Sequence, residues 1–547
     1  MRSACHVVRR RCVVEARGDG MQTSSPGQGR QEPRDSVAVL STAEAEGPCW
    51  DPRLRKQRLR RNLLVVSASS FLVNSAFLSL SHLQASMLNI ESGLGTVSLS
   101  AISSSFVLSC MFLAPFFISV AGLKVTIGAC TLLYTPYFIA NFYPQWVTVL
   151  PTSFVLGFGA GPLCTANYAY VAELATQYAG LNHQNSDAAF GHFFGVFLMF
   201  SQLSQVFGNL LSYVIIQAGN TTGESTVVNQ EASSDKRSTC GVNFCPQSPL
   251  PTNMTAPTAT SRFQLCVVYT AFGWIAALVV FLLLDPLERK MQRHDKASLQ
   301  LLMLTVRHMK NPYQMFIIPL TIFSGLEISF IADDFTKAFI TCTWGVNYVG
   351  LFLVSLGASG ALFSLSFGWL VHITGRPQMV LLGAVVNVAM IILMLSYETG
   401  YILVVLLVAS GVWGIADAAW TTHLISFYAV AFRQNPEAAF ASCHLWRSVG
   451  TIASLSYSSV VCTDVKLYIL LCALTVGVAG YFAVDAEVRR VAAAAAVVLP
   501  RATVVNATMT PIVSVAGLQP LAATRSLDGA IPVIIPALFT SNSLVAR

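Results

Sequence analysis

Charged side chains are scarce in this sequence. Asp, Glu, Lys and Arg together make up 11% of the 547 residues, less than half of the roughly 25% that soluble globular domains carry. Apolar residues make up 54%, and apolar runs of about 20 residues, each long enough to cross a bilayer, recur along most of the chain. These features exclude an ordinary soluble protein. The composition predicts an all-α, multipass membrane protein.

Motifs of soluble chemistry are also missing. The sequence contains no P-loop, no HExxH run and no nucleophile elbow, so we predict neither an enzyme nor a cofactor. The 13 cysteines form no CxxC pair and no zinc-like spacing, so we predict no metal site. The net charge of +7 comes from Lys and Arg residues that sit beside the apolar runs, as the positive-inside rule expects, which argues against nucleic acid as a partner.

Twelve apolar runs are predicted to cross the membrane. They are residues 62–83, 97–119, 123–141, 146–171, 190–215, 263–284, 312–332, 346–371, 377–396, 401–428, 437–460 and 465–485. An even number places both termini on one side, and the loops of that side hold most of the nearby Lys and Arg, including the cluster from Arg53 to Arg61. We therefore expect cytoplasmic termini, with the plasma membrane as the compartment.

The same reading divides the chain into segments. We expect a disordered cytoplasmic tail at 1–61, helices one to five at 62–215, a glycosylated extracytoplasmic loop at 216–262, helix six at 263–284, a basic cytoplasmic linker at 285–311, helices seven to twelve at 312–487 and a disordered cytoplasmic tail at 488–547.

The long loop at 216–262 has the features of an extracytoplasmic face. Glycosylation sequons begin at Asn220 and Asn253. Cys240 and Cys245 are the two cysteines that share a polar loop, and we predict that they form a disulfide with each other. Packing is the expected role of the cysteines inside spans, which are Cys110, Cys130, Cys164, Cys266, Cys443 and Cys472.

The sequence contains an internal repeat. Residues 187–191, DAAFG, open the fifth span, and residues 437–441, EAAFA, open the eleventh, 250 residues later. Gly122, between spans two and three, corresponds to Gly375, between spans eight and nine. Two six-helix units in the same orientation are the architecture of the major facilitator fold, which has a central cavity between its halves.

Several motifs resemble the uncoordinated-93 (unc-93) family. They are Leu150-Pro151-Thr152-Ser153, the run Gly157 to Leu163, Gly325-Leu326-Glu327, Thr341-Cys342-Thr343, the run Gly411 to Trp420, Glu437-Ala438-Ala439-Phe440 and the run Val465 to Leu471. The likeness covers roughly residues 60–485. It implies a major facilitator fold with a regulatory role, because the nematode founder of the family regulates a two-pore potassium channel and a vertebrate member escorts Toll-like receptors.

The inner loops depart from the pattern of transporters with this fold. Such transporters usually carry Gly-xxx-Asp-Arg/Lys-x-Gly-Arg, whose acid and base lock the helices during alternating access. Here the second copy runs from Gly368 to Gly375 and Arg376, with His372 in place of the acid, and the first copy has Ser119 at that position. This sequence argues against ordinary transporter gating.

Two opposite charges are predicted at equal depth on consecutive spans. Asp417 lies about eleven residues from the inner end of the tenth span and Arg447 about ten residues into the eleventh, so at 1.5 Å per residue both sit about 15 Å deep, near the midplane. We predict an ion pair that is either a structural clamp or a protonation or ligand site. His444, Ser448 and Thr451 extend a polar stripe from Arg447.

A further acid, Glu327, is predicted about 22 Å along the seventh span and nearer the outer face. Together with Asp333 and Asp334 it could line an acidic outer vestibule that attracts cations, and a solvated helix end is the simpler expectation for the two aspartates. Asn74 in the first span is another polar candidate for the cavity, with an interhelical hydrogen bond as the alternative.

Two functions follow from these patterns. The first is a multipass regulatory protein that binds another membrane protein such as a potassium channel, which the resemblance and the eroded inner loops favour. The second is a major facilitator-type solute transporter coupled to protons or cations through Asp417 or Glu327, which the repeat and the buried charges favour. Fold alone cannot decide between them.

Overall fold

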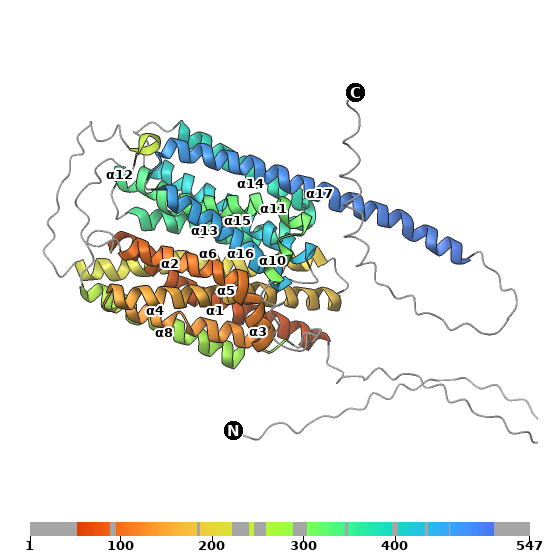
Figure 1. Cartoon of the computed structure of the whole chain (residues 1–547), viewed down its shortest axis with the longest axis horizontal. Helices are drawn as coiled ribbons and strands as arrows, with labels where there is room; N and C mark the ends of the chain where they lie inside the picture. Colours follow the sequence, from red (N-terminus) through yellow and green to blue (C-terminus); the bar gives the residue numbers. More distant parts are fainter. Residues whose placement is uncertain are drawn as a thin grey trace, which may run out of the picture. The chain divides into compact units, whose positions relative to one another are not determined.

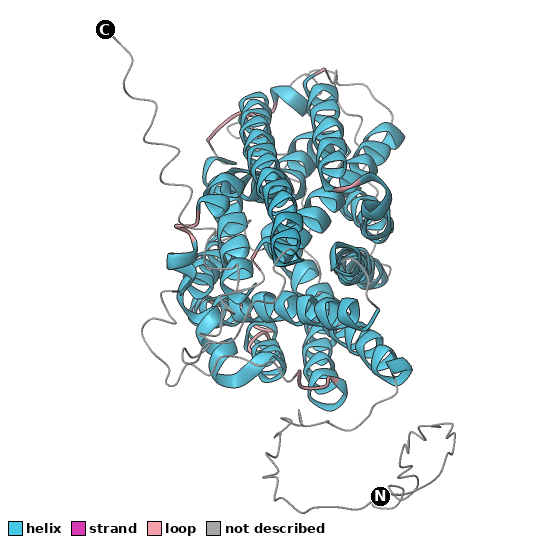
Figure 2. Ribbon diagram, turned by 90° about the vertical axis from the view of Figure 1, so that its right-hand side faces the viewer, coloured by secondary structure: helices cyan, strands magenta, loops and turns pink. Residues whose placement is uncertain are grey.

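The computed structural model describes residues 52–87, 94–182, 186–220, 240–245, 259–287, 304–344, 348–396, 403–432, 436–458 and 460–507. Within these ranges every regular element is a helix (Figure 2). Ten of the helices are long and apolar enough to cross a membrane, as a chain with so little charge requires.

The first half of the chain, coloured red to yellow-green in Figure 1, contains the elements up to residue 283. They are α1 (Pro52–Met87), α2 (Leu94–Leu108), the π-helical turn η1 (Ser109–Leu113), α3 (Ala114–Leu132), α4 (Thr135–Ala140), α5 (Trp146–Asn182), α6 (Ser186–Asn220), the short turn η2 (Gly241–Asn243) and α8 (Ala259–Leu283).

The second half begins with a short helix and continues with six long ones (Figure 1). Its elements are α10 (Leu304–His308), α11 (Pro312–Ser329), the π-helical segment η3 (Phe330–Thr341), α12 (Cys342–Trp344), α13 (Val349–Thr374), α14 (Arg376–Leu395), α15 (Leu403–Ala431), α16 (Pro436–Ser458) and α17 (Thr463–Ala507). Asn311 caps α11 by accepting a 3.0 Å hydrogen bond from the Tyr313 N–H.

The count of ten differs from the predicted twelve for two reasons. Predicted spans two and three are counted as one stretch, Val97–Ala140, although the backbone at Gly122 is not helical. Predicted span eleven is α16, which is helical over 23 residues but is more polar than the ten and is not among them. The number of twelve crossings stays a prediction.

Helix extends into both segments that were predicted to be disordered tails. α1 begins at Pro52, ten residues before the predicted span, and α17 runs to Ala507, twenty residues past residue 487. The prediction is therefore wrong for 52–61 and 488–507. Arg, Lys and Ala dominate these stretches and are among the best helix formers, which polarity alone does not reveal.

Gly122 and Gly375 share one backbone conformation. Their φ and ψ angles are 76° and 164° at Gly122 and 82° and 159° at Gly375, a region that glycine enters without steric cost. The chain reverses direction after Gly122. The evidence is a 3.3 Å hydrogen bond from the Thr126 hydroxyl to the Phe117 carbonyl, because nine residues of straight helix would separate these two residues by about 13 Å. The equal turns support the six-helix repeat.

The helix bundle has a turn end and a loop end. The turn end holds Gly122 and Gly375, and the loop end holds residues 240–245. Since α1 runs from the turn end and each later long helix reverses direction, the starts of α6, α11 and α16 also lie at the turn end (Figure 1).

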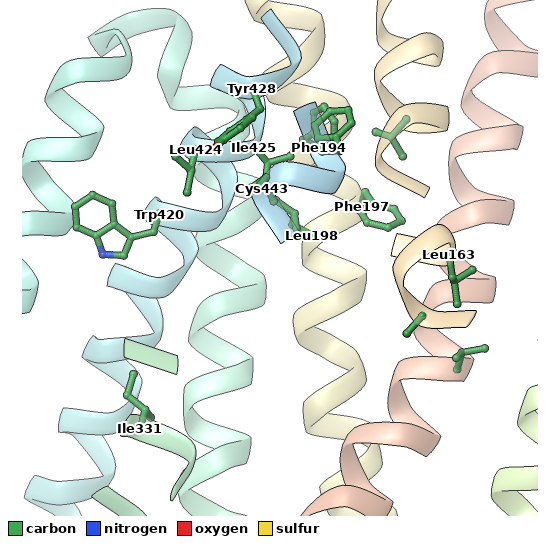
Figure 3. Packing of buried hydrophobic residues seen from close by; sticks show 14 of the residues in the cluster. Leu163, Phe194, Phe197, Leu198, Ile331, Trp420, Leu424, Ile425, Tyr428 and Cys443 are labelled. Atoms are coloured by element: carbon green, nitrogen blue, oxygen red, sulfur yellow. The ribbon is translucent and has the colours of Figure 1, made fainter. Parts of the chain in front are cut away.

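The halves meet along α6 and α13, where glycines let the backbones approach. A Cβ added at Gly368 would lie 2.4 Å from the Gly191 carbonyl oxygen, and one added at Gly195 would lie 2.9 Å from the Ser364 carbonyl oxygen. Small residues at a membrane helix interface give close packing of this kind. Figure 3 shows part of the buried apolar cluster that continues from this contact, with Phe194 and Leu198 of α6 in the same cluster as side chains of α15 and α16.

The predicted disulfide between Cys240 and Cys245 is wrong. Cys240 pairs with Cys342, which begins α12, and Cys245 pairs with Cys462, which precedes α17. The cause is the packing of residues 240–245 against the loop end of the second half, where the Phe244 carbonyl accepts from the Thr463 N–H at 3.0 Å. Asn220 is the last residue of α6, Asn253 lies outside the described residues, and their glycosylation stays a prediction.

Candidate functional site

A polar cluster occupies the middle of the bundle where α6, α15 and α16 meet. Asp417 of α15 is 3% exposed, and its Oδ1 lies 3.7 Å from Nη2 of Arg447, whose side chain is 25% exposed. The ion pair that equal depth predicted is therefore present in the structure. Its role as a clamp or as a binding group stays a prediction.

Gln202 is a member of this cluster that the sequence analysis missed. Its Nε2 donates a 2.6 Å hydrogen bond to Oδ2 of Asp417, although the two residues are 215 positions apart. Gln202 lies on α6 in the first half and Asp417 on α15 in the second, so this bond joins the halves. The polar residues of α6 indicate that this helix makes hydrogen bonds inside the bundle, but the sequence does not identify Asp417 as the partner of the Gln202 amide.

Close helix contacts position these side chains. The Arg447 carbonyl oxygen lies where a Cβ of Gly325 would be, so α16 and α11 are in backbone contact there. Gly360 of α13 packs against the Gln202 side chain, and a Cβ on Gly414 of α15 would come within 2.3 Å of the Leu356 carbonyl oxygen of α13. Short residues on three helices thus bring a short Asp side chain within reach of its partners.

Glu327 lies inside the second half and is fully buried. The Trp413 indole N–H lies 3.2 Å from Oε1 of Glu327 and 3.1 Å from Oδ1 of Asn387 and donates to both. Oε2 of Glu327 has no hydrogen-bond partner among the described residues. Trp413 is one helical turn before Asp417, so both acids belong to one region, and Trp413 both packs in the buried cluster and donates hydrogen bonds there.

The acidic outer vestibule is absent from the described part of the chain. Asp334 is 4% exposed, and its Oδ1 lies 2.7 Å from Nζ of Lys466, which is 2% exposed. The Ser458 hydroxyl donates to the same Oδ1 at 2.6 Å. Asp333 pairs with Lys337 one turn later at 2.7 Å. The expectation of two solvated aspartates is wrong for Asp334, because α17 brings a lysine onto it.

The polar stripe on α16 divides between two neighbours. The His444 ring lies 4.6 Å from the Tyr168 ring of α5, centroid to centroid, so it faces the first half. The Thr451 hydroxyl donates to the Gly325 carbonyl at 3.3 Å and therefore belongs to the α11 contact. Ser448 is half-buried between them. The polar residues of this stripe therefore do not line one water-filled cavity together.

Asn74 lies at a cavity, but this cavity is inside the first half. Its Nδ2 donates to the Ser70 hydroxyl at 3.3 Å, and both residues line a space of about 150 Å³ between α1, α3, α5 and α6. The residues that line this space all belong to one half, whereas the predicted central cavity lies between the halves.

Similar proteins support one family assignment. The sequence model described as "Ion channel regulatory protein UNC-93" matches residues 86–483 of this chain. The chain belongs to the UNC-93 family. Protein unc-93 homolog A of Xenopus laevis is 36% identical over 429 residues, which cover 77% of this UNC-93 chain and 92% of the frog protein. Its human counterpart is 34% identical over 436 residues, covering 78% and 93%.

A nematode member carries a functional name. The "Putative potassium channel regulatory protein unc-93" of Caenorhabditis elegans is 29% identical over 440 residues, which cover 79% of this chain and 61% of the nematode protein. Among solved structures, the E. coli fucose:proton symporter superposes with a TM-score of 0.52 at 12% identity over 76% of this chain and 97% of its own. A proton:xylose symporter of the major facilitator superfamily gives 0.51 at 13%, over 77% and 94%. These structures establish the fold of the UNC-93 chain.

The inner-loop residues of this UNC-93 chain have structural roles. Gly368 contacts α6, Gly375 makes the turn, and Arg376 is the first residue of α14. His372 lies in α13, and its side chain is outside the described set. The Ser119 hydroxyl donates to the Phe116 carbonyl of its own helix at 2.8 Å.

The chemistry that the buried cluster can support is limited and specific. Two buried carboxylates lie in this region: Asp417 pairs with the Arg447 guanidinium at 3.7 Å, and Glu327 accepts from the Trp413 indole N–H. Such a set can hold a fixed ion pair or exchange a proton or a small cation at a carboxylate, and intramembrane charges are candidates for either role.

Proposed function

We propose that this UNC-93 protein is an accessory protein that binds another membrane protein and modulates a potassium channel. The observation that carries the proposal is the contact between the halves. Backbones of α6 and α13 approach at Gly191 and Gly368, and the hydrogen bond from Gln202 to Asp417 bridges the halves in the bilayer interior. This contact suits a fixed scaffold better than two bodies that rock against each other.

The composition of the inner loops and the family support the same conclusion. The second inner loop has His372 where transporters of this fold carry an acid, so the lock that stabilises one state during transport is missing. The nematode relative is named as a potassium channel regulatory protein.

The proposed orientation places the turn end in the cytoplasm and the chain in the plasma membrane. The start of α1 carries the exposed basic residues Arg55, Arg58 and Arg60 at that end, in accord with the positive-inside rule. The opposite end carries two disulfides, which persist on an oxidising, extracytoplasmic side. Glycans at Asn220 and Asn253 would lie on that side too.

The test is a whole-cell recording of potassium current. Cells express a two-pore potassium channel with or without this chain, and biotinylation reports the surface level of both proteins. We expect the chain to change current or gating at constant channel surface level. Gln202→Leu, which removes the bond between the halves and keeps both charges, is expected to weaken the effect. Gly350→Ala is the control, because a Cβ there meets nothing within 4 Å. No change in several such channels, with the chain at the surface, would reject the proposal.

Transport is the second candidate, and one observation favours it. Glu327 and Asp417 are both buried, and the ion pair of Arg447 is with Asp417, so Glu327 is a carboxylate that suits a site for a proton or a cation. A saturable solute flux under an imposed pH gradient, abolished by Asp417→Asn after the flux is normalised to the surface level of each variant, would establish transport. A flux that survives this substitution would remove Asp417 from any coupling role.

A further inference from the structure

The first turns of α1 carry a high density of positive charge. Six of the nine residues from Arg53 to Arg61 are Lys or Arg, and α1 contains no Asp or Glu along its whole length. The five arginines among them are exposed, and Lys56 is half-buried. We call Arg53 to Arg61 the basic segment. The positive-inside rule accounts for cations at this end of the bundle, but it does not require them to be held in place on a helix.

The basic segment lies at the level of the lipid headgroups. Leu64, three residues after Arg61, is an exposed apolar side chain of the first span, so the hydrocarbon begins near it. At 1.5 Å per residue the basic segment extends about 12 Å from there. The headgroup region on each side of the hydrocarbon is roughly 5–8 Å thick. The cations nearest the span therefore lie among the headgroups, and the others lie just outside them.

Arg60 is fixed in position by a neighbouring helix. Its Nη2 donates a 2.8 Å hydrogen bond to the Tyr178 hydroxyl of α5, and its guanidinium carbon lies 5.6 Å from the centroid of the Tyr178 ring. A guanidinium has five N–H donors, so further donors remain for a ligand. Lys56 lies one turn earlier on the same face of α1, near enough for its charge to act on the Tyr178 hydroxyl. The two cations therefore converge beside α5.

We propose that the basic segment, at Lys56 and Arg60 beside Tyr178, binds the headgroup of a phosphoinositide in the cytoplasmic leaflet. Clusters of about four to eight Lys and Arg residues next to a membrane helix on that side recognise acidic lipids. Phosphatidylserine carries a single net negative charge, whereas a phosphoinositide carries several on its phosphates and complements such a cluster better. Arginine also binds phosphate through two parallel N–H bonds. Arg61 has another role, because it pairs with Asp285 just after α8.

A lipid site at the basic segment is independent of both functions proposed above. It rests on the proposed orientation, which places the turn end in the cytoplasm, where acidic lipids are concentrated. A bound lipid would anchor α1 against α5 whether the chain modulates a channel or carries a solute. Because binding is measured on the purified chain, loss of channel modulation or of transport does not decide it.

The test is a lipid titration of the full chain in a neutral detergent, with native mass spectrometry as the measure of Kd. The probe is dioctanoyl phosphatidylinositol bisphosphate, and the comparison lipids are dioctanoyl phosphatidylserine and phosphatidylcholine. Inositol trisphosphate, the headgroup without its tails, represents a soluble phosphate. The variant is Lys56→Gln with Arg60→Gln. The control is Arg307→Gln with Lys310→Gln, which removes two exposed charges at the same end of the bundle.

We expect the phosphoinositide to bind at least about tenfold more tightly than phosphatidylserine, and phosphatidylcholine not to bind. At about fivefold for each cation, Lys56→Gln with Arg60→Gln should weaken binding about 25-fold. The control should weaken it less than about threefold, because α10, which contains Arg307, packs against α16 and η1. The free headgroup should bind more weakly than the lipid, since it lacks the tails that enter the hydrocarbon.

Four results would overturn the proposal. Equal affinity for the phosphoinositide and for phosphatidylserine would mean that no headgroup is recognised. No loss of binding in Lys56→Gln with Arg60→Gln would leave these cations with a role in orientation only. An equal loss in the control would mean a diffuse attraction without a site beside Tyr178. Free headgroup that binds as tightly as the lipid would make the ligand a soluble phosphate. The comparison of lipids on the unmodified chain tests the headgroup preference even if a variant fails to fold.

Discussion

Gly368→Ala tests whether the two halves are held together by direct backbone contact. The new Cβ would lie 2.4 Å from the Gly191 carbonyl oxygen, and ordinary contact begins at 3.4 Å, so α6 and α13 must separate by about 1.0 Å (3.4 − 2.4). Overpacking of this kind costs about 1–3 kcal/mol. The change also gains up to about 1 kcal/mol because Ala is the better helix former. Gly350→Ala, in the first turn of the same helix, has no clash, since nothing lies within 4 Å of its Cβ, and its gain in helix propensity is no larger.

The difference between the two variants isolates the packing cost. We expect Gly368→Ala to unfold more easily than Gly350→Ala by about 1–3 kcal/mol, measured by thermal unfolding of the purified proteins in nanodiscs with tryptophan fluorescence as the signal. Gly195→Ala, on the facing helix, should behave like Gly368→Ala. Equal melting of Gly368→Ala and Gly350→Ala would refute the reasoning, because it would mean that α6 and α13 do not touch at the turn end.

Three further outcomes are expected. Lys466→Met leaves the buried carboxylate of Asp334 without its cation and should lower the stability by about 3–5 kcal/mol. Lys337→Met removes the exposed pair with Asp333 and should cost less than about 1 kcal/mol. Equal melting temperatures of the two variants would contradict the burial of the Asp334–Lys466 pair. Asp417→Asn should reduce surface expression, and adding Arg447→Gln to the same chain should restore part of it. A double-mutant cycle on the free energy of unfolding should give a coupling of about 0.5–3 kcal/mol between the two positions. Additive effects of the two substitutions would mean that the ion pair contributes nothing. After cleavage at a protease site engineered into 246–258, the two fragments should stay joined on a gel until a reductant is added. Separation without a reductant would support a Cys240–Cys245 disulfide instead.

The depth of a charge could be predicted from the sequence, but the direction it faces could not. Asp417 and Arg447 interrupt apolar runs, and a fixed rise of 1.5 Å per residue places them at equal depth, so their pairing was predictable. Glu327 was placed at a depth in the same way, yet its side chain points into the second half toward Trp413. The face of one helix is determined by its neighbours, and a single sequence does not contain their crossing angles.

The cysteine pairings at the loop end also depended on tertiary contacts, which a single sequence does not contain. Cys342 and Cys462 lie outside the predicted spans on the same side as Cys240 and Cys245, so the sequence held the four partners. With four cysteines there are three possible pairings, and the shortest loop was the wrong choice. Lys466 is one of the few cations on that side and Asp334 is one of the few acids, so the sequence offered this ion pair as a possibility. The loop charges were used to assign the topology and not to predict a pairing.

The disulfide between Cys245 and Cys462 fixes an order in the making of the protein. Its cysteines are 217 residues apart, so at about 5–20 residues per second the ribosome needs roughly 10–40 s between them. During that interval Cys245 has no native partner, and Cys240 has none until Cys342, 102 residues after it, has been made. In the proposed orientation, the second bridge can close only when the connection before α17 has reached the oxidising side. Its closure therefore marks a chain whose second half has been threaded into the bilayer.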